Sequence, residues 1–177
     1  MPSGKTHDAL TILLGVPVFA GGYAVSGSVA IAAFLTTAYL FGGIMFGPDL
    51  DVVSSQQPRW GVFKFLWAPY RWMFAHRSRW SHGLVFGTLF RVIYFMGIVT
   101  VFALLAAFVY SAYAGGDLPR FAEVGAAWGR SGSLVRVYLG PNALVIAFGG
   151  MWLGAAVHTL TDITVTYVRT GRVNGFL

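Results

Sequence analysis

Residues 9–46 read ALTILLGVPVFAGGYAVSGSVAIAAFLTTAYLFGGIMF, a stretch that contains no charged residue. A helix needs about 20 apolar residues to cross the hydrocarbon core of a bilayer, so this stretch is long enough for two crossings. The small polar triplet Ser26-Gly27-Ser28 lies near its middle and suits a tight turn. The stretch therefore predicts two membrane-spanning helices joined by a short turn.

A cleavable signal peptide is the alternative interpretation of this stretch, because SGSVA at residues 26–30 offers the small residues of a cleavage site. Asp8 and the weakly charged N-terminal region do not fit such a peptide. The apolar run also continues past the supposed cleavage point. We therefore favour a retained pair of helices.

The composition of the whole chain agrees with a membrane protein. Of its 177 residues, 56% are hydrophobic and 10% are charged, whereas a soluble domain carries about 25% charged residues. No cysteine is present, so any metal must be held by nitrogen and oxygen ligands. The net charge of +6 could indicate nucleic acid, but the charges flank apolar segments. Anionic lipid headgroups explain them more simply, and no nucleic-acid partner is expected.

Two further apolar stretches, residues 84–113 and 140–167, predict a third and a fourth span. Arg91 lies near the start of the third span, where its side chain could reach the headgroups. Gly150 and Gly154 in the fourth span have the small-xxx-small spacing that lets helices approach closely. Residues 114–139 are interpreted as a Gly-rich loop.

Residues 58–80 are rich in tryptophan, tyrosine and phenylalanine and are predicted to form an amphipathic segment at the membrane interface. The expected fold is therefore all-α: about four transmembrane helices plus this interfacial segment, in a single domain over residues 1–177. The segment is interpreted first as an anchor, and alternatively as a lip that presents lipid to a site. Membrane lipids are its expected partners in either case.

Lysine and arginine counts give the expected orientation. With a cytoplasmic N-terminus and four spans, nine of these residues lie on the cytoplasmic side: Lys5, Arg59, Lys64, Arg71, Arg77, Arg79, Arg91, Arg169 and Arg172. Only Arg120, Arg130 and Arg136 then lie outside. The positive-inside rule accordingly predicts that both termini are cytoplasmic.

The same topology gathers the chemically versatile side chains. All four histidines, and most of the acids, fall at the cytoplasmic ends of the predicted helices. Seven of these side chains are candidate metal ligands: His7, Asp49, Asp51, His76, His82, His158 and Asp162. His158 and Asp162 are four residues apart, so a helix places both on one face. Pro48 restricts the chain before Asp49 and Asp51, where the helix hydrogen bonding of the second span ends.

Each of these residues taken alone is more often structural, as an interfacial anchor or a helix cap. As a set they indicate a metal site, because a cluster of unpaired carboxylates is costly to bury. Imidazole and carboxylate without thiolate suit Zn²⁺ first, with Mn²⁺ or Fe²⁺ as alternatives. Seven candidates exceed the four ligands of a closed zinc site. They favour two metals, or one metal with a surrounding shell of orienting carboxylates.

The ordered motifs resemble a known family. The chain has His7, then PDLD at 48–51, AHRSRWSHG at 75–83 and VHTLTD at 157–162. This order is similar to that of the bacterial and archaeal membrane-bound metal-dependent hydrolases, and most similar to a branch described as membrane-bound metal-binding proteins. The chain departs from the pattern at Ser78-Arg79-Trp80, where the family tends to have Gly-Phe-Thr. No histidine or glutamate follows Asp162.

The resemblance implies a distant relation to zinc-dependent phospholipase C and P1-type nucleases, and hence phosphoester hydrolysis by metal-activated water. It points to the seven candidate ligands and to the bacterial or archaeal inner membrane. Asp51 is the expected proton acceptor, although other assignments fit equally well. Arg77 and Arg79 could pair with an anionic or phosphorylated substrate, or be ordinary positive-inside residues.

Two other functions compete with the hydrolase. In the first, a non-catalytic membrane protein uses a metal to hold its helix ends together and serves as a subunit or assembly factor of a larger complex. An enzyme needs an open coordination position, whereas such a structural site is filled. The second, a metal transporter, fits less well, because no candidate ligand lies at mid-membrane depth.

Overall fold

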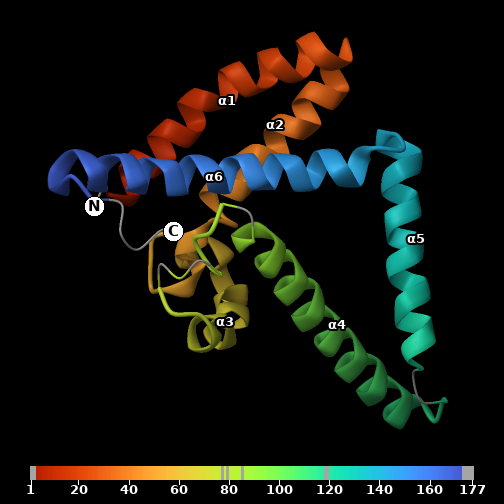
Figure 1. Ribbon diagram of the computed structural model, residues 1–177. Coiled ribbons are helices and arrows are strands. Elements are labelled where there is room, and N and C mark those ends of the chain that lie inside the picture. The colour runs from red at the N-terminus through yellow and green to blue at the C-terminus, as the bar shows by residue number, and fades with distance from the viewer. Residues whose placement is uncertain (1–2, 77, 79, 85, 118–119, 173–177) are drawn as a thin grey trace. The chain divides into compact units, whose positions relative to one another are not determined.

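The computed structural model describes residues 3–76, 78, 80–84, 86–117 and 120–172. The regular secondary structure of these residues is helical, with no strand among them (Figure 1). The elements are α1 (Gly4–Ser26), α2 (Val29–Ile44), η1 (Pro48–Asp51), η2 (Gln57–Trp67), α3 (Ala68–Met73), α4 (Gly87–Ala114), α5 (Phe121–Leu139) and α6 (Ala143–Thr170). The all-α prediction is confirmed.

The chain divides into two compact units. One comprises Met1–Arg91 with Val145–Leu177, and the other comprises Val92–Leu144. Each unit is described by itself below. All seven predicted metal ligands belong to the first unit.

Helices α1 and α2 form the predicted antiparallel pair (Figure 1). Gly27 ends α1 with a φ of +64°, a left-handed conformation that glycine adopts without steric cost. Ser28 then caps α2 by accepting a hydrogen bond from the backbone N–H of Ile31 at 3.4 Å. The two helices lie close together near this turn, because a Cβ on Gly22 would be 3.3 Å from the Cα of Ala32. The predicted turn is thus in its predicted place.

Helix α6 packs against α2 through its small residues. A Cβ on Gly150 would lie 2.7 Å from the Cβ of Ala38, and a Cβ on Gly154 would lie 2.5 Å from the backbone nitrogen of Gly43. Neither position has room for a larger side chain. The expected close contact at this small-xxx-small spacing is confirmed, and it places the middle of α6 beside the end of α2.

The segment between α2 and α4 is irregular. Segment 58–80 is not one continuous amphipathic helix, because Gly61 breaks η2 with φ +54° and ψ −125°. Trp67 and Tyr70 are fully buried, while Phe63 and Trp72 are exposed. The aromatic side chains of this segment therefore fall into two sets, one buried inside the first unit and one exposed on its surface.

Polar side chains tie this segment to the ends of α1 and α2. The amide of Gln56 donates to the carbonyl of Gly43 at 3.1 Å. Arg59 pairs with Asp8 and donates to the carbonyl of Ile44 at 2.5 Å. Because these donors satisfy carbonyls that the end of α2 leaves free, the turn that follows α2 is held in place.

In the second unit the predicted Gly-rich loop is wrong. Its described C-terminal part is the helix α5. Val124, Trp128 and Val135 recur at helical spacing, and Glu123 accepts a hydrogen bond from the backbone N–H of Arg120 at the helix start. The Trp128 indole donates to Thr100 of α4 at 2.9 Å. The apolar stripe and the capped start thus favour a helix over Phe121–Leu139 in spite of its glycines.

Within the part of the chain that the structure describes, four helical segments are long and apolar enough to cross a membrane: Gly4–Ser26, Val29–Asp51, Gly87–Ala114 and Ala143–Thr170. This agrees with the number of spans expected. The expectation that Arg91 reaches out to headgroups is wrong, because its side chain is only 1% exposed. Its guanidinium instead donates to the carbonyl of Ser81 and to Thr88.

Candidate metal centre

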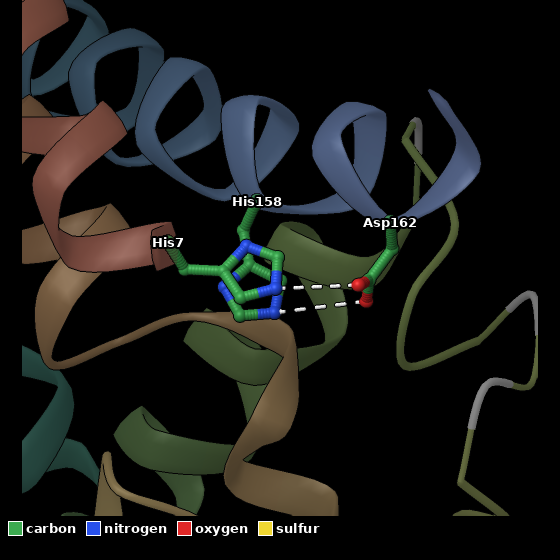
Figure 2. Close-up of side chains that lie close together, drawn as sticks. All are labelled: His7, His158 and Asp162. Carbon is green, nitrogen blue, oxygen red and sulfur yellow. Dashed lines mark ion pairs between the residues drawn. The ribbon is translucent and has the colours of Figure 1, made fainter. Parts of the chain in front are cut away.

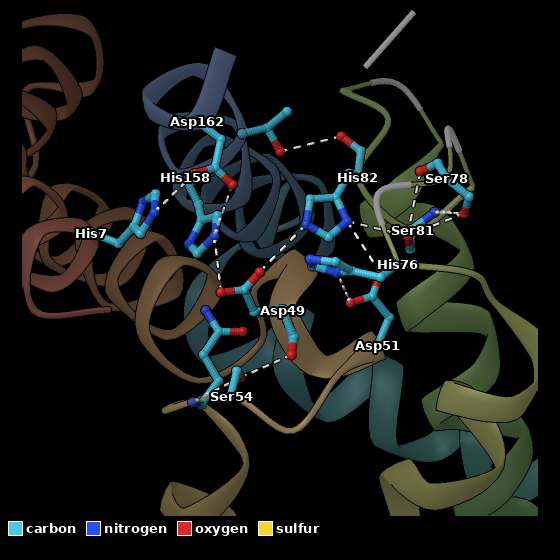
Figure 3. A network of polar contacts seen from close by, with 12 residues as sticks. His7, Asp49, Asp51, Ser54, His76, Ser78, Ser81, His82, His158 and Asp162 are labelled. Atoms are coloured by element: carbon cyan, nitrogen blue, oxygen red, sulfur yellow. Dashed lines mark hydrogen bonds and ion pairs between the residues drawn. The ribbon is translucent and has the colours of Figure 1, made fainter. Parts of the chain in front are cut away.

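The first unit brings the seven predicted ligands into one connected network (Figure 3). His7 comes from the first turn of α1, and His158 and Asp162 from α6. Asp49 and Asp51 lie on η1, while His76 and His82 lie between α3 and α4. Arg77 and Arg79, the predicted substrate-binding residues, are outside the residues that the structure describes.

The first group of ligands is formed by His7, His158 and Asp162 (Figure 2). Their ligand atoms all lie within 4.8 Å of one another. The Nε2 atoms of His7 and His158 lie 3.2 Å and 3.9 Å from different oxygens of Asp162. The two imidazole rings stack, with centroids 3.8 Å apart. Helical spacing in α6 and the start of α1 thus present three donors to one point.

The second group is formed by Asp49, His76 and His82, whose ligand atoms also lie within 4.8 Å of one another. The Nε2 of His82 is 3.4 Å from Oδ1 of Asp49. His76 is partly exposed, with 37% of its side chain accessible, while His82 is buried. This group therefore has one side open to the surroundings.

Asp49 connects the two groups. Its Oδ1 lies 3.4 Å from Nε2 of His82, and its Oδ2 lies 3.4 Å from Nε2 of His158. In Figure 3 the Asp49 carboxylate lies between the two histidines, with one contact to each. The network is therefore continuous from α1 to the His76–His82 segment.

Asp51 lies outside both groups but contacts two of their histidines. Its Oδ1 accepts a hydrogen bond from Nδ1 of His76 at 2.9 Å, and its Oδ2 lies 3.2 Å from Nδ1 of His82. The Asp51 side chain is fully buried. The Ser81 hydroxyl also lies 3.2 Å from Nδ1 of His82. Contacts at Nδ1 thus hold both rings and leave the Nε2 of each to bind a metal, the usual role of polar groups behind a metal-binding histidine.

The donor atoms of the network are buried and short of partners. Among the described side chains, Nε2 of His82, both ring nitrogens of His158 and both oxygens of Asp162 are buried without a hydrogen bond. Buried polar atoms left in this state are costly, so each calls for a ligand. Nitrogen and carboxylate lone pairs that converge without a donor between them suit a divalent cation, and the residues present therefore fit a metal.

Protonation of His82 reflects the same surroundings. Burial alone would lower the pKa of His82, but the carboxylates of Asp49 and Asp51 favour the charged ring and raise this pKa above its ordinary value. A metal ion and a proton compete for the same nitrogen. The negative charge of these two carboxylates, which favours a proton on His82, also favours a metal cation at the same place.

The local sequence explains the position of the two aspartates. Pro48 begins η1 with a fixed φ, and Gly47 before it lies so close to Gln56 that a Cβ would be 3.0 Å from the Gln56 amide carbon. The Ser54 hydroxyl donates to the backbone carbonyl of Asp49 at 2.9 Å. The tight turn is thus fixed on both sides, so the two carboxylates point to different partners.

Three further side chains hold the turn that carries His82, and sequence reasoning missed them. The Arg91 guanidinium of α4 donates a hydrogen bond to the backbone carbonyl of Ser81. From α6, the Thr159 hydroxyl donates to the carbonyl of His82 at 3.2 Å, and the Trp152 indole donates to the carbonyl of Leu84. Thr159 directly follows His158, which was the one available signal. Arg91 is ten residues from Ser81 but was expected to reach the headgroups, and the Trp152 contact joins residues far apart in sequence, so both roles become visible only in the fold.

Comparison with known proteins agrees with the geometry. Residues 2–172 match a family described as "Uncharacterized metal-binding protein (DUF2227)". The chain belongs to this family. Metal binding is therefore a property of the family as well as an interpretation of the seven side chains, and the family match includes all of them.

More distant comparisons add little to the family match. The chain is 39% identical over 57 residues to an uncharacterized protein of Aquifex aeolicus (strain VF5). That similarity covers 32% of this chain and 40% of the relative's length. No solved structure matches the chain. Metal identity and catalysis must therefore be argued from the site itself.

Proposed function

We propose that this protein is a membrane-embedded, metal-dependent hydrolase that acts on a phosphoester, in a lipid-like molecule, at the cytoplasmic face of the inner membrane. The observation that carries the proposal is the buried His/Asp network, with its convergent nitrogen and oxygen atoms that lack hydrogen-bond partners. A bound divalent ion, Zn²⁺ first and Mn²⁺ or Fe²⁺ next, supplies a polarising charge and activates water at neutral pH.

The residues of the chain have separate tasks in this proposal. His7, His158, Asp162, Asp49, His76 and His82 hold metal. Asp51 orients His76 and His82 through their Nδ1 atoms. The expectation that Asp51 is the proton acceptor stays a prediction. We assign Arg77 and Arg79, in the same segment as His76, to the anionic group of the substrate.

Two features support a lipid-like substrate. The centre is built on helices that are apolar enough to span a membrane, since His7 is in the first turn of α1, and His158 and Asp162 are in α6. Beside it, a mainly apolar groove of about 330 Å³ lies between α1 and α6 and is lined by Leu10, Leu14, Val157, Leu160, Thr161, Thr164 and Val165. Val157 directly precedes His158, so the groove and the ligands share one region of α6.

The activity test uses the detergent-purified protein and two phosphoesters. Bis(p-nitrophenyl) phosphate reports hydrolysis by the centre alone, and phosphatidic acid in mixed micelles reports the lipid preference. The proposal expects metal-dependent hydrolysis that falls by at least 100-fold in His158→Ala and is unchanged in Trp72→Ala, an exposed residue on α3 that has no part in the network. Equal rates in wild type and His158→Ala would show that any hydrolysis comes from a contaminant.

A structural metal site is the second candidate, and one observation favours it. The ligands come from α1, η1, α6 and the His76–His82 segment, so bound metal would also join four parts of the fold. In that case the protein would serve a membrane complex as a subunit or assembly factor. Full metal content without hydrolysis of either phosphoester, together with metal that resists exchange, would favour this function over the hydrolase.

A further inference from the structure

The two ligand groups are distinct in composition. One contains His7, His158 and Asp162, the other contains Asp49, His76 and His82, and no residue belongs to both. Nitrogen ligands bind Zn²⁺ at about 2.1 Å, so the ligands of one ion lie within roughly 4.2 Å of each other. Each group is close to that size by itself. The six residues therefore form two small sets instead of one large one.

The orientation of the Asp49 carboxylate links these sets. One oxygen faces His82 of the second group and the other faces His158 of the first, each at 3.4 Å. A carboxylate that serves one ion alone would direct its oxygens to one side. Here the two oxygens face nitrogen atoms of different groups, which is the arrangement of a carboxylate between two cations.

The contacts of each group determine which of its atoms are available to bind a metal. Nδ1 of His76 bonds to Oδ1 of Asp51, and Nδ1 of His82 lies 3.2 Å from both Oδ2 of Asp51 and the Ser81 hydroxyl, so the Nε2 atoms of the two histidines remain for a metal. On the other side, His158 has no hydrogen-bond partner at either ring nitrogen, and neither has Asp162 at either oxygen. Both groups thus keep donor atoms that can bind a metal.

We infer that the centre holds two divalent ions, one in each group, and that the two oxygens of Asp49 bind different ions. The inference rests on the metal site of the proposed function, but it does not require hydrolysis. Loss of activity with two ions present would count against the hydrolase alone. A single ion would count against this inference and leave the hydrolase open.

The first part of the test is stoichiometry. The metal-stripped full-length protein in detergent is loaded with Zn²⁺, freed of excess ion, and analysed for zinc per chain. The wild type is expected to hold two ions. His7→Ala and His82→Ala, which each remove a ligand from one group only, are expected to hold one. One ion in the wild type, or complete loss of zinc in either single variant with the fold intact, would overturn the inference.

The second part tests the bridge. Mn²⁺-loaded wild type is expected to show the half-spaced hyperfine lines of a coupled ion pair in its electron paramagnetic resonance spectrum. Asp49→Asn, of similar size, is expected to lose these lines or one ion, and Trp72→Ala, a change at an exposed α3 residue outside the network, is expected to keep them. Two ions per chain without coupling in the wild type would overturn the bridging role.

In the stoichiometry test, circular dichroism shows whether His7→Ala is folded. If it is not, Asp162→Asn replaces it as the variant that removes a ligand from the first group.

Discussion

Asp51 contacts two histidines of the centre at their Nδ1 atoms, and at the scale of single residues this is the contact that gives the site its direction. An Nδ1–H bonded to a carboxylate fixes both the tautomer and the rotation of the ring, so that Nε2 points to the metal. His76, which is partly exposed, depends on this contact more than the buried His82 does.

Asp51→Asn is expected to weaken metal binding by about 10- to 100-fold without changing the number of ions, because it removes the orienting charge and no ligand. The measurement is a zinc titration against a chelator of known affinity. Trp72→Ala, a change at an exposed residue outside the network, serves as the control. A loss of one ion per chain would instead make Asp51 a ligand, as the sequence first indicated.

Thr159→Val tests the hydrogen bond that α6 donates to the His82 carbonyl. Losing this bond leaves a buried carbonyl without its donor, which costs about 1–3 kcal/mol of unfolding free energy. Thr161→Val is the control, because the Thr161 hydroxyl donates only within α6, to Val157. In detergent, the thermal unfolding midpoint of Thr159→Val should be lower than that of Thr161→Val. Equal midpoints would show that the hydrogen bond from Thr159 to the His82 carbonyl does not stabilise the protein.

At the scale of elements, packing of small residues places the ligands. Helix α6 can bring His158 and Asp162 to the end of α2 only because Gly154 lies against the α2 backbone. The same helix supplies Trp152 and Thr159 to the His82 turn. One close helix contact therefore positions two ligands and steadies a third.

Gly154→Ala is expected to destabilise the protein by about 1–3 kcal/mol, because its Cβ would overlap the backbone of α2. Gly149→Ala, on the same helix with nothing within 4 Å of the added Cβ, is expected to be neutral or stabilising by up to about 1 kcal/mol. The unfolding midpoint and the zinc content report the two effects. Tolerance of Gly154→Ala in both measurements would contradict the packing described.

The sequence predicts these elements unevenly, for physical reasons. The turn at Gly27 and the contact at Gly154 follow from local rules on glycine, and both are confirmed. The seven candidate ligands were expected to meet at one level because they were placed at helix ends. The structure brings them together, although His158 lies near the middle of α6. Helix α5 was missed because its glycines outweighed a sparse apolar stripe. The role of Asp51 and the donor from Trp152 depend on tertiary contacts that no local pattern encodes.

At the scale of the whole molecule, metal should stabilise the fold, because the ligands come from separated parts of the chain. An ion that binds only the folded state adds about 2.7 kcal/mol at a free concentration of 100 times its dissociation constant. Chelation should therefore lower the thermal unfolding midpoint of the wild type, and zinc should restore it. His158→Ala should respond less. The same shift in both proteins would place the stabilising metal elsewhere.

The measurement that tests the metal centre most directly is elemental analysis of the detergent-purified protein. Wild type is compared with the double variant His82→Ala/His158→Ala, which removes a ligand from each group, and with Trp72→Ala as a surface control. The account predicts a stoichiometric transition metal in the wild type and the control, and none in the double variant. Equal metal content in all three proteins, or no metal in zinc-supplied wild type, would contradict it.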